Sequence, residues 1–217
     1  LHVEYSTGPA ANQAPNDDGE LTDSDTVIIG DNEPGPGGEI ITEEVRVTTN
    51  SDDAEESASG SMNLTSSDLE LVYDHGDQTV GIRFVGVDIP QGATISDAYV
   101  QFKTDEMHSQ ATSLTIEAQD SDNAQPFTSS MWNISNRATT GAGVWWDPAA
   151  WTTLREVGAA QRTPDLSSII QEVVNRPGWS NGNSLVLIIT GTGERVADSY
   201  DGDHNGAPLL HVEYIQY

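Results

Sequence analysis

The residues best suited to binding a ligand form an acidic loop near the C-terminal end of the sequence. Residues 201–206 read DGDHNG and match the D-x-D-x-N-G opening of a calcium loop, in which alternate side chains supply oxygen ligands and glycine makes the bend. Val212 stands at the twelfth position, where an EF-hand needs a glutamate, so the loop is not an EF-hand. A β-sandwich can complete such a site from neighbouring loops, and the sequence therefore predicts calcium here. The predicted ligands are Asp198, Asp201, Asp203 and Asn205.

A second acidic run, DDAEE at residues 52–56, offers further oxygen ligands. Asp52 and Asp53 are the candidates that could complete the calcium site from another loop or hold an ion of their own. Solvated surface charge is the alternative for both acidic groups, because a chain with 35 acidic residues contains many such patterns by chance.

Tryptophan residues are the other candidates for binding chemistry. Trp145, Trp146 and Trp151 lie within a stretch of seven residues. An exposed indole can stack on a sugar ring through CH–π contact and burial of apolar surface. Adjacent side chains of a strand point to opposite faces, so at least one of Trp145 and Trp146 packs in the core. We select Trp146 and Trp151 as the sugar-stacking candidates, with packing in the core as the alternative.

Patterns typical of catalysis are missing from the sequence. The five histidines are scattered, no pair of them has metal-ligand spacing, and neither a nucleophile elbow nor a phosphate-binding loop occurs. We therefore expect a protein that is not an enzyme. Two sequons, at Asn63 and Asn133, permit N-glycosylation in a host that carries out this modification.

Charge and composition limit the setting and the partners. Asp and Glu number 35 against eight Lys and Arg, which gives a formal net charge of -27. Such a surface repels phosphate backbones and anionic lipids, which argues against nucleic acid as a partner. No apolar run is long enough for a transmembrane helix, so we expect no membrane insertion. The absence of cysteine and a composition rich in Gly, Ser, Thr and Asn favour an extracellular or cell-surface location. Without disulfides, packing and bound metal are expected to stabilise the fold there.

The elements that position these residues are expected to be strands. Short segments of alternating apolar and polar residues, separated by turns rich in Gly, Pro and Asn, indicate an all-β, antiparallel β-sandwich of the jelly-roll type over residues 39–217. The expected strands cover residues 41–48, 68–73, 79–85, 95–103, 114–118, 184–190 and 208–214. One helix is predicted near residues 164–176, with Thr163 as N-cap and an apolar stripe that packs on the sandwich as a cap.

The first 38 residues differ in composition from the rest. Residues 6–38 hold four prolines and six glycines without Lys or Arg, which predicts an acidic linker that cannot fold by itself. Residues 1–5, LHVEY, are identical to residues 210–214 in the last expected strand. The identity predicts that residues 1–5 are equivalent to the closing strand of a neighbouring repeat or dock on a neighbouring copy, with chance as the alternative.

Five segments follow one another in a recognisable order. They are ISDAYVQF at 95–102, the strand at 114–118, the helical stretch at 165–179, NSLVL at 183–187 and APLLHVEY at 207–214. This order resembles the DNRLRE-type jelly-roll domains of large bacterial secreted and surface proteins, over residues 43–214. The hexapeptide that names the family is absent. The resemblance implies a jelly-roll fold, and some members of the family are classed as carbohydrate-binding modules, but it transfers no ligand-contacting residue.

Two functions are expected from these observations. The first is a non-catalytic structural repeat of an extracellular filament or surface adhesin, whose jelly-roll domains are joined by linkers, stabilised by calcium and assembled with neighbouring copies. The alternative is a carbohydrate-binding module of a secreted protein that acts on polysaccharide. The linker and the repeated strand favour the first function, whereas the tryptophans and the family resemblance fit both.

Overall fold

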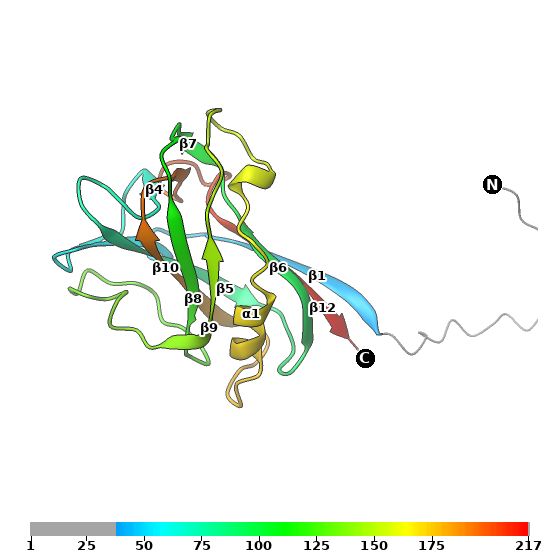
Figure 1. Cartoon of the computed structure of the whole chain (residues 1–217). Coiled ribbons are helices and arrows are strands. Elements are labelled where there is room, and N and C mark those ends of the chain that lie inside the picture. The colour runs from blue at the N-terminus through cyan, green and yellow to red at the C-terminus, as the bar shows by residue number, and fades with distance from the viewer. Residues whose placement is uncertain (1–37, 217) are drawn as a thin grey trace, which may run out of the picture. The chain divides into compact units, whose positions relative to one another are not determined.

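The computed structural model describes residues 38–216, which belong to a compact unit that spans Pro34–Tyr217. The predicted strand at residues 1–5 and the predicted linker at residues 6–38, apart from Gly38, lie outside the described residues. The predicted fold class is confirmed, because the described chain forms an antiparallel β-sandwich with a single short α-helix (Figure 1).

Two main sheets and one small sheet build the structure, and all of their strand pairs are antiparallel. The larger sheet has the order β3-β2-β5-β10-β8-β9, and the opposite sheet has the order β1-β12-β6. The strands of the larger sheet are β2 (Asp53–Ser57), β3 (Met62–Asn63), β5 (Gln78–Val87), β8 (Ser113–Gln119), β9 (Thr139–Trp146) and β10 (Asn183–Thr192). Those of the opposite sheet are β1 (Glu39–Arg46), β6 (Thr94–Gln101) and β12 (Leu209–Gln216). The small sheet comprises β4 (Asp68–Glu70), β11 (Val196–Asp198) and β7 (Thr104–Glu106).

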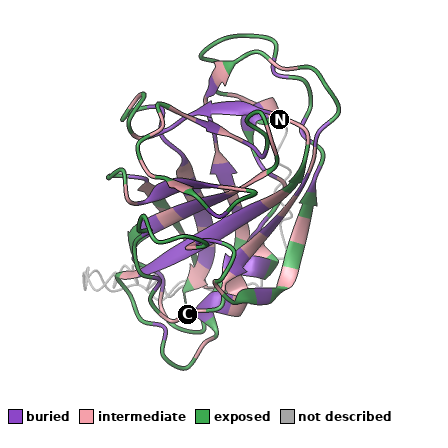
Figure 2. Cartoon of the chain, turned by 90° about the vertical axis from the view of Figure 1, so that its left-hand side faces the viewer, coloured by how far each residue is buried: buried purple, intermediate pink, exposed green. Residues whose placement is uncertain are grey.

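The main core lies between the two main sheets, because one face of each strand is apolar. In β8, Leu114, Ile116 and Ala118 are buried, while the residues between them are half-buried. Val100 of β6 and Leu210 of β12 enter the same core from the opposite sheet. Figure 2 shows the buried residues following the strands, with exposed residues gathered in the loops. The alternation that predicted the strands therefore also decides which face of each strand is buried.

Strand β10 is buried on both faces, as its continuous apolar sequence predicts. Leu187 and Ile189 point into the main core. Val186 and Ile188 point to the other side of the sheet, where Phe127 and its neighbours cover them in a second, smaller core. The segment that contains Phe127 thus shields the central part of the outer face of the larger sheet.

The helix is shorter than predicted. α1 spans Ser167–Val174 and not residues 164–176. Thr163 does not cap it, because its Oγ1 accepts a hydrogen bond from the Val100 N–H of β6, 3.0 Å away. Asp165 instead accepts a hydrogen bond from the Ser167 N–H at the start of the helix. The predicted apolar stripe is buried, and α1 packs against β6, β8 and β9. No helix within residues 38–216 is long and apolar enough to cross a membrane.

The edges of the two main sheets differ in how they are covered. The outer side of β6 pairs with the chain before α1, where the Leu166 N–H donates to the Ala98 carbonyl at 2.7 Å. The outer side of β9 is covered by the Glu172 carboxylate of α1, which accepts from the Gly141 and Ala142 N–H groups at 2.7 and 2.8 Å. Such contacts block the addition of another strand. Among the described residues, β1 has β12 as its only strand partner, so its outer side is an open edge.

Candidate functional site

The predicted calcium loop already contains a positive charge. Lys103, the only lysine of the chain, places Nζ 2.6 Å from Asp198 Oδ2 and 2.6 Å from Asp203 Oδ2. The contact with Asp198 is an ion pair and not a well-directed hydrogen bond. Asp198 and then Asp203 raise the pKa of Lys103, and Lys103 in turn lowers the pKa of Asp203. Calcium was predicted at Asp198 and Asp203 because their negative charges need a cation. The Lys103 ammonium group supplies that positive charge.

The other two predicted ligands do not join this pair. Asp201 and Asn205 are exposed, and the Asn205 N–H donates to Asp203 Oδ1 at 3.0 Å in a turn within the loop. Close packing, and not ion binding, explains the two glycines of the loop. A side chain at Gly206 would collide with the Asp198 carboxylate, and one at Gly202 would collide with a backbone carbonyl of the neighbouring loop. The loop sequence thus fits close packing around Lys103.

The acidic run before and within β2 contacts this loop through Asp53. Asp53 Oδ2 accepts a hydrogen bond from the Tyr200 N–H at 2.7 Å. Burial is the largest cause that raises the pKa of Asp53 to about 7; the hydrogen bond from Tyr200 lowers this pKa, and the nearby charges of Asp201 and Asp52 add to the rise. Asp52 is fully buried and pairs with Arg83, whose Nη1 lies 2.6 Å from Asp52 Oδ1. Asp52 therefore has a protein counter-ion, whereas Asp53 is held in a site that favours its neutral form.

Three carboxylates outside the predicted sites lie close enough together to bind one ion. Within residues 38–216, carboxylate oxygens of Asp68, Asp105 and Glu106 lie within 4.8 Å of one another on the small sheet. Burial, followed by contact with Asp198, raises the pKa of Asp105 to about 6, and burial also raises the pKa of Asp68. The sequence does not single out this group, because β4 and β7 meet only through their pairing with β11.

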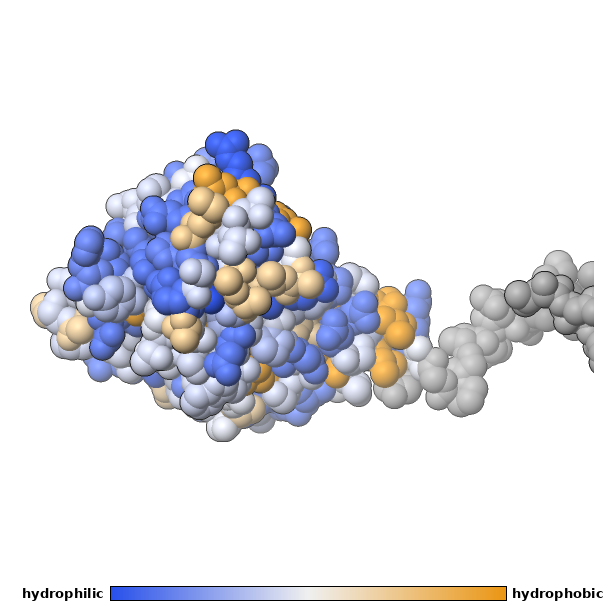
Figure 3. All heavy atoms as spheres, turned by 45° about the horizontal axis from the view of Figure 1, so that its top comes forward, coloured by the Kyte–Doolittle hydropathy of each residue, from blue (hydrophilic) through white to orange (hydrophobic). Residues whose placement is uncertain are grey.

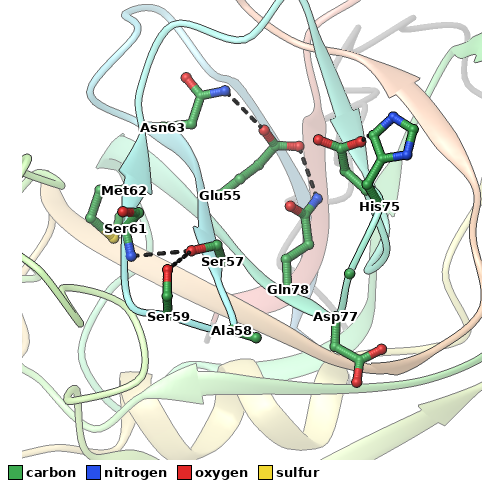
Figure 4. Close-up of a pocket in the computed structure, with 12 residues that line it drawn as sticks. Glu55, Ser57, Ala58, Ser59, Ser61, Met62, Asn63, His75, Asp77 and Gln78 are labelled. Atoms are coloured by element: carbon green, nitrogen blue, oxygen red, sulfur yellow. Dashed lines mark hydrogen bonds and ion pairs between the residues drawn. The ribbon is translucent and has the colours of Figure 1, made fainter.

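A polar hollow of about 430 Å³ lies beside β2, β3 and the turn before β5 (Figure 4). Glu55 points into it and is almost fully buried. Its carboxyl group accepts hydrogen bonds from the Glu70 N–H at 2.9 Å, from Gln78 Nε2 at 3.2 Å and from Asn63 Nδ2 at 3.4 Å. Burial and contact with the Glu70 carboxylate raise the pKa of Glu55 to about 9. These contacts tie strands β2, β3 and β4 together, so Glu55 acts as a neutral structural group at neutral pH.

The two tryptophans selected for sugar stacking lie in the core, and this prediction is wrong. Trp146 is 5% exposed and stacks on Phe102 with 5.9 Å between ring centroids. Trp151 is fully buried and donates from Nε1 to the Ala160 carbonyl at 2.8 Å. The expected alternation is nevertheless present, because Trp145 is 68% exposed on the other face of β9. Of these two adjacent tryptophans, the exposed one is therefore Trp145 and not the predicted Trp146.

The two sequons differ in how freely their asparagines are presented. Asn63 is exposed at the end of β3. Asn133 is half-buried, and its Oδ1 accepts hydrogen bonds from the Thr128 N–H at 3.0 Å and from Arg137 Nη2 at 3.1 Å. Asn63 is thus the more exposed of the two predicted glycosylation sites, and its Nδ2 donates to Glu55 Oε2 at 3.4 Å.

The surface is mainly polar. On the face seen in Figure 3, hydrophilic residues dominate and hydrophobic residues form separate patches. Exposed apolar side chains such as Met107, Leu154 and Val157 belong to loops. Exposed apolar residues are normal on protein surfaces and do not by themselves define a site.

Comparison with known proteins gives no matching family model and no matching curated protein. The family resemblance noted in the sequence therefore rests on its motifs, and the function has to be argued from the residues.

Proposed function

We propose that this protein is a non-catalytic structural unit of an extracellular filament or cell-surface adhesin, in which copies associate head to tail. The observation that carries the proposal is the identity of residues 1–5 with residues 210–214 of β12. In β12 this sequence pairs with β1 on one side and with β6 on the other. A segment with the same sequence has the side chains that suit a strand beside β1.

The partner surface in this proposal is the open edge of β1 on a second copy. In β12, Leu210, His211 and Tyr214 lie opposite Val45, Glu44 and Ile41 of β1. A strand formed by residues 1–5 of another copy can present Leu, His and Tyr to the same three residues from the outer side. Strand addition of this kind satisfies main-chain hydrogen bonds, and a head-to-tail contact that does not close on itself propagates as a fibre.

The energy of such a contact comes mainly from apolar burial. Leu210, Val212 and Tyr214 are almost completely buried in β12, which shows how much surface this sequence can bury in a sheet. Each large apolar side chain contributes about 1.5–3 kcal/mol when it is fully buried. The gain at an edge is smaller, because β1 is itself partly exposed, but three such side chains and the new main-chain hydrogen bonds support a specific association.

Calcium belongs to this proposal at a site other than the predicted loop. Lys103 occupies the position between Asp198 and Asp203, so these residues do not need an ion. Asp68, Asp105 and Glu106 are the described acidic residues whose spacing suits a divalent cation. A calcium titration followed by EDTA, read as the thermal midpoint, tests this part separately, because an ion that binds the folded state raises the midpoint.

Light scattering after size-exclusion chromatography tests the assembly. The whole chain should gain mass with concentration, and the double variant Val3→Asp/Tyr5→Asp should stay monomeric. Ile28→Asp/Ile29→Asp is the matched control, because it places the same two negative charges in the apolar stretch TVII at residues 26–29, which is not repeated in β12. A whole chain that remains monomeric at every concentration, with or without calcium, would overturn the proposal. Equal loss of mass in Ile28→Asp/Ile29→Asp would also do so, since the effect would then not depend on the repeated strand.

The alternative function, a carbohydrate-binding module, needs an exposed aromatic surface in place of Trp146 and Trp151. Trp145 supplies a specific observation in its favour, because its indole is exposed on the outer face of the larger sheet.

A further inference from the structure

A row of side chains crosses the outer face of the larger sheet near the ends of β9 and β10. The strand registers place Thr190 of β10 opposite Thr115 of β8, and Thr115 opposite Trp145 of β9. Thr190 and Thr79 of β5 lie next to each other in the continuation of the β10–β5 register, and both line one hollow. Neighbouring strands are about 4.8 Å apart, so the row from Thr79 to Trp145 is about 14 Å long.

Trp145 is held as a fixed platform at one end of this row. Its Nε1 donates to Ser113 Oγ at 2.9 Å and lies 3.1 Å from Asp147 Oδ1. These contacts orient the indole while 68% of the residue stays exposed. Gly143 precedes Trp145 by two residues on the same face, so no side chain stands between the ring and the solvent there. A pre-oriented ring loses little conformational freedom when a ligand stacks on it.

A second exposed tryptophan lies at the other end of the row. Trp132 is 40% exposed and lines a hollow of about 250 Å³ together with Thr79 and Thr190. Its ring packs on Gly60, where any side chain would collide with the indole. Close to Trp145, a further hollow of about 430 Å³ is lined by Ser113, Thr192 and other residues. Threonine hydroxyl groups therefore lie between the two indoles, and a hollow lined partly by hydroxyl groups lies at each end of the row.

We propose that this face binds a neutral polysaccharide chain. Trp145 and Trp132 stack on sugar rings through CH–π contact, and the threonine hydroxyls hydrogen-bond to sugar hydroxyls between them. The two aromatic positions and the length of the row suit a chain and not a single sugar. Glu117 and Asp147 border the row, and the formal net charge is -27, so an anionic chain is repelled. This face belongs to the larger sheet, so it does not depend on strand addition at β1 in the opposite sheet.

Affinity electrophoresis of the whole chain in gels that contain one polysaccharide each tests this proposal. The probes are barley β-glucan, xyloglucan and galactomannan as neutral chains, and alginate as the anionic chain. We expect retardation by at least one neutral chain and none by alginate. Trp145→Ala should weaken the retarding affinity at least tenfold and Trp132→Ala severalfold, while Thr115→Val keeps the shape of the row and tests one hydroxyl group. Tyr73→Ala is the matched control, because Tyr73 is also an exposed aromatic residue but lies outside the row.

Each outcome decides for or against the proposal. Retardation by a neutral chain that Trp145→Ala removes and Tyr73→Ala leaves unchanged supports it. Absence of retardation by all three neutral chains overturns it, as does binding that Trp145→Ala does not weaken. A loss of self-association in Trp145→Ala, measured by light scattering, would instead identify the face as a contact between copies. Because Val3→Asp/Tyr5→Asp leaves this face intact, its polysaccharide binding should equal that of the unchanged chain even if the assembly proposal fails.

Discussion

Asp53 makes the stability of the fold depend on pH, and Asp53→Asn should remove a large part of this dependence. Asp53 is 4% exposed, and burial is the largest cause that raises its pKa to about 7 from the ordinary value of 3.8. Its folded form therefore holds a proton more tightly than the unfolded chain does. The contribution of the neutral Asp53 carboxyl to the free energy of unfolding is fully present below about pH 4. It is lost as the pH rises through about 7.

The size of this loss follows from the two pKa values. A difference between about 7 and 3.8 corresponds to about 4 kcal/mol, at about 1.4 kcal/mol for each pH unit. Relaxation around the charged carboxylate reduces this value, so we expect about 2–4 kcal/mol. The asparagine amide keeps an oxygen that can accept the Tyr200 N–H, and it carries no charge beside Asp52 and Asp201. Asp53→Asn should therefore match the unchanged chain near pH 4 and exceed its stability near pH 8.5.

Urea unfolding followed by tryptophan fluorescence measures this difference over about pH 4 to 9. A decline should remain in Asp53→Asn from about pH 4.5 to 9, because burial and Glu70 raise the pKa of Glu55 from 4.5 to about 9. Asp88→Asn is the control, since it removes one negative charge from an exposed position and should change stability by less than about 0.5 kcal/mol. If Asp53→Asn and the unchanged chain lose stability in parallel up to pH 8.5, Asp53 is not held neutral and the reasoning is wrong.

Three further substitutions test the contacts around the candidate sites. Lys103→Met should cost about 3 kcal/mol, because it leaves buried Asp198 without a counter-ion, and added calcium should raise its thermal midpoint more than that of the unchanged chain. Arg195→Met should cost about 3 kcal/mol or more in urea unfolding, because the buried guanidinium donates to several backbone carbonyls, among them those of Pro148 and Ala149. Glu172→Ala should cost about 1–2 kcal/mol and increase light scattering on storage, because it uncovers the edge of β9.

The strands could be predicted because their burial pattern is local. β5, β6, β8, β10 and β12 all lie where alternating or continuous apolar sequence indicates a strand. β9 was not predicted, because Thr139–Trp146 contains two glycines and few large apolar residues before its tryptophans. Residues 163–166 looked like the start of a helix, but their N–H and side-chain groups pair with β6 instead. Tertiary pairing of this kind cannot be read from helix-capping residues alone.

The candidate sites were harder to predict because they depend on contacts between distant segments. Lys103 and Asp203 are 100 positions apart in the sequence, so the acidic loop gave no sign of its counter-ion. The alternation of side chains along a strand correctly placed Trp145 and Trp146 on opposite faces, but it could not decide which of them faces the core. That choice depends on the pairing of β9 with β8, where Trp146 lies opposite buried Leu114. Sequence reasoning therefore identified the right kind of residue and the wrong member of the pair.

The scarcity of positive charge links the structural and the binding proposals. The chain has eight basic residues against 35 acidic ones, and several of the eight serve the fold. Lys103 holds the loop around Asp203, Arg83 pairs with Asp52, and Arg195 holds buried carbonyls. Basic groups committed in this way are not free to recruit an anionic ligand. Recognition at the face around Trp145 must then rely on stacking and hydroxyl groups, which is why a neutral chain, and not an acidic one, is the ligand that this surface suits.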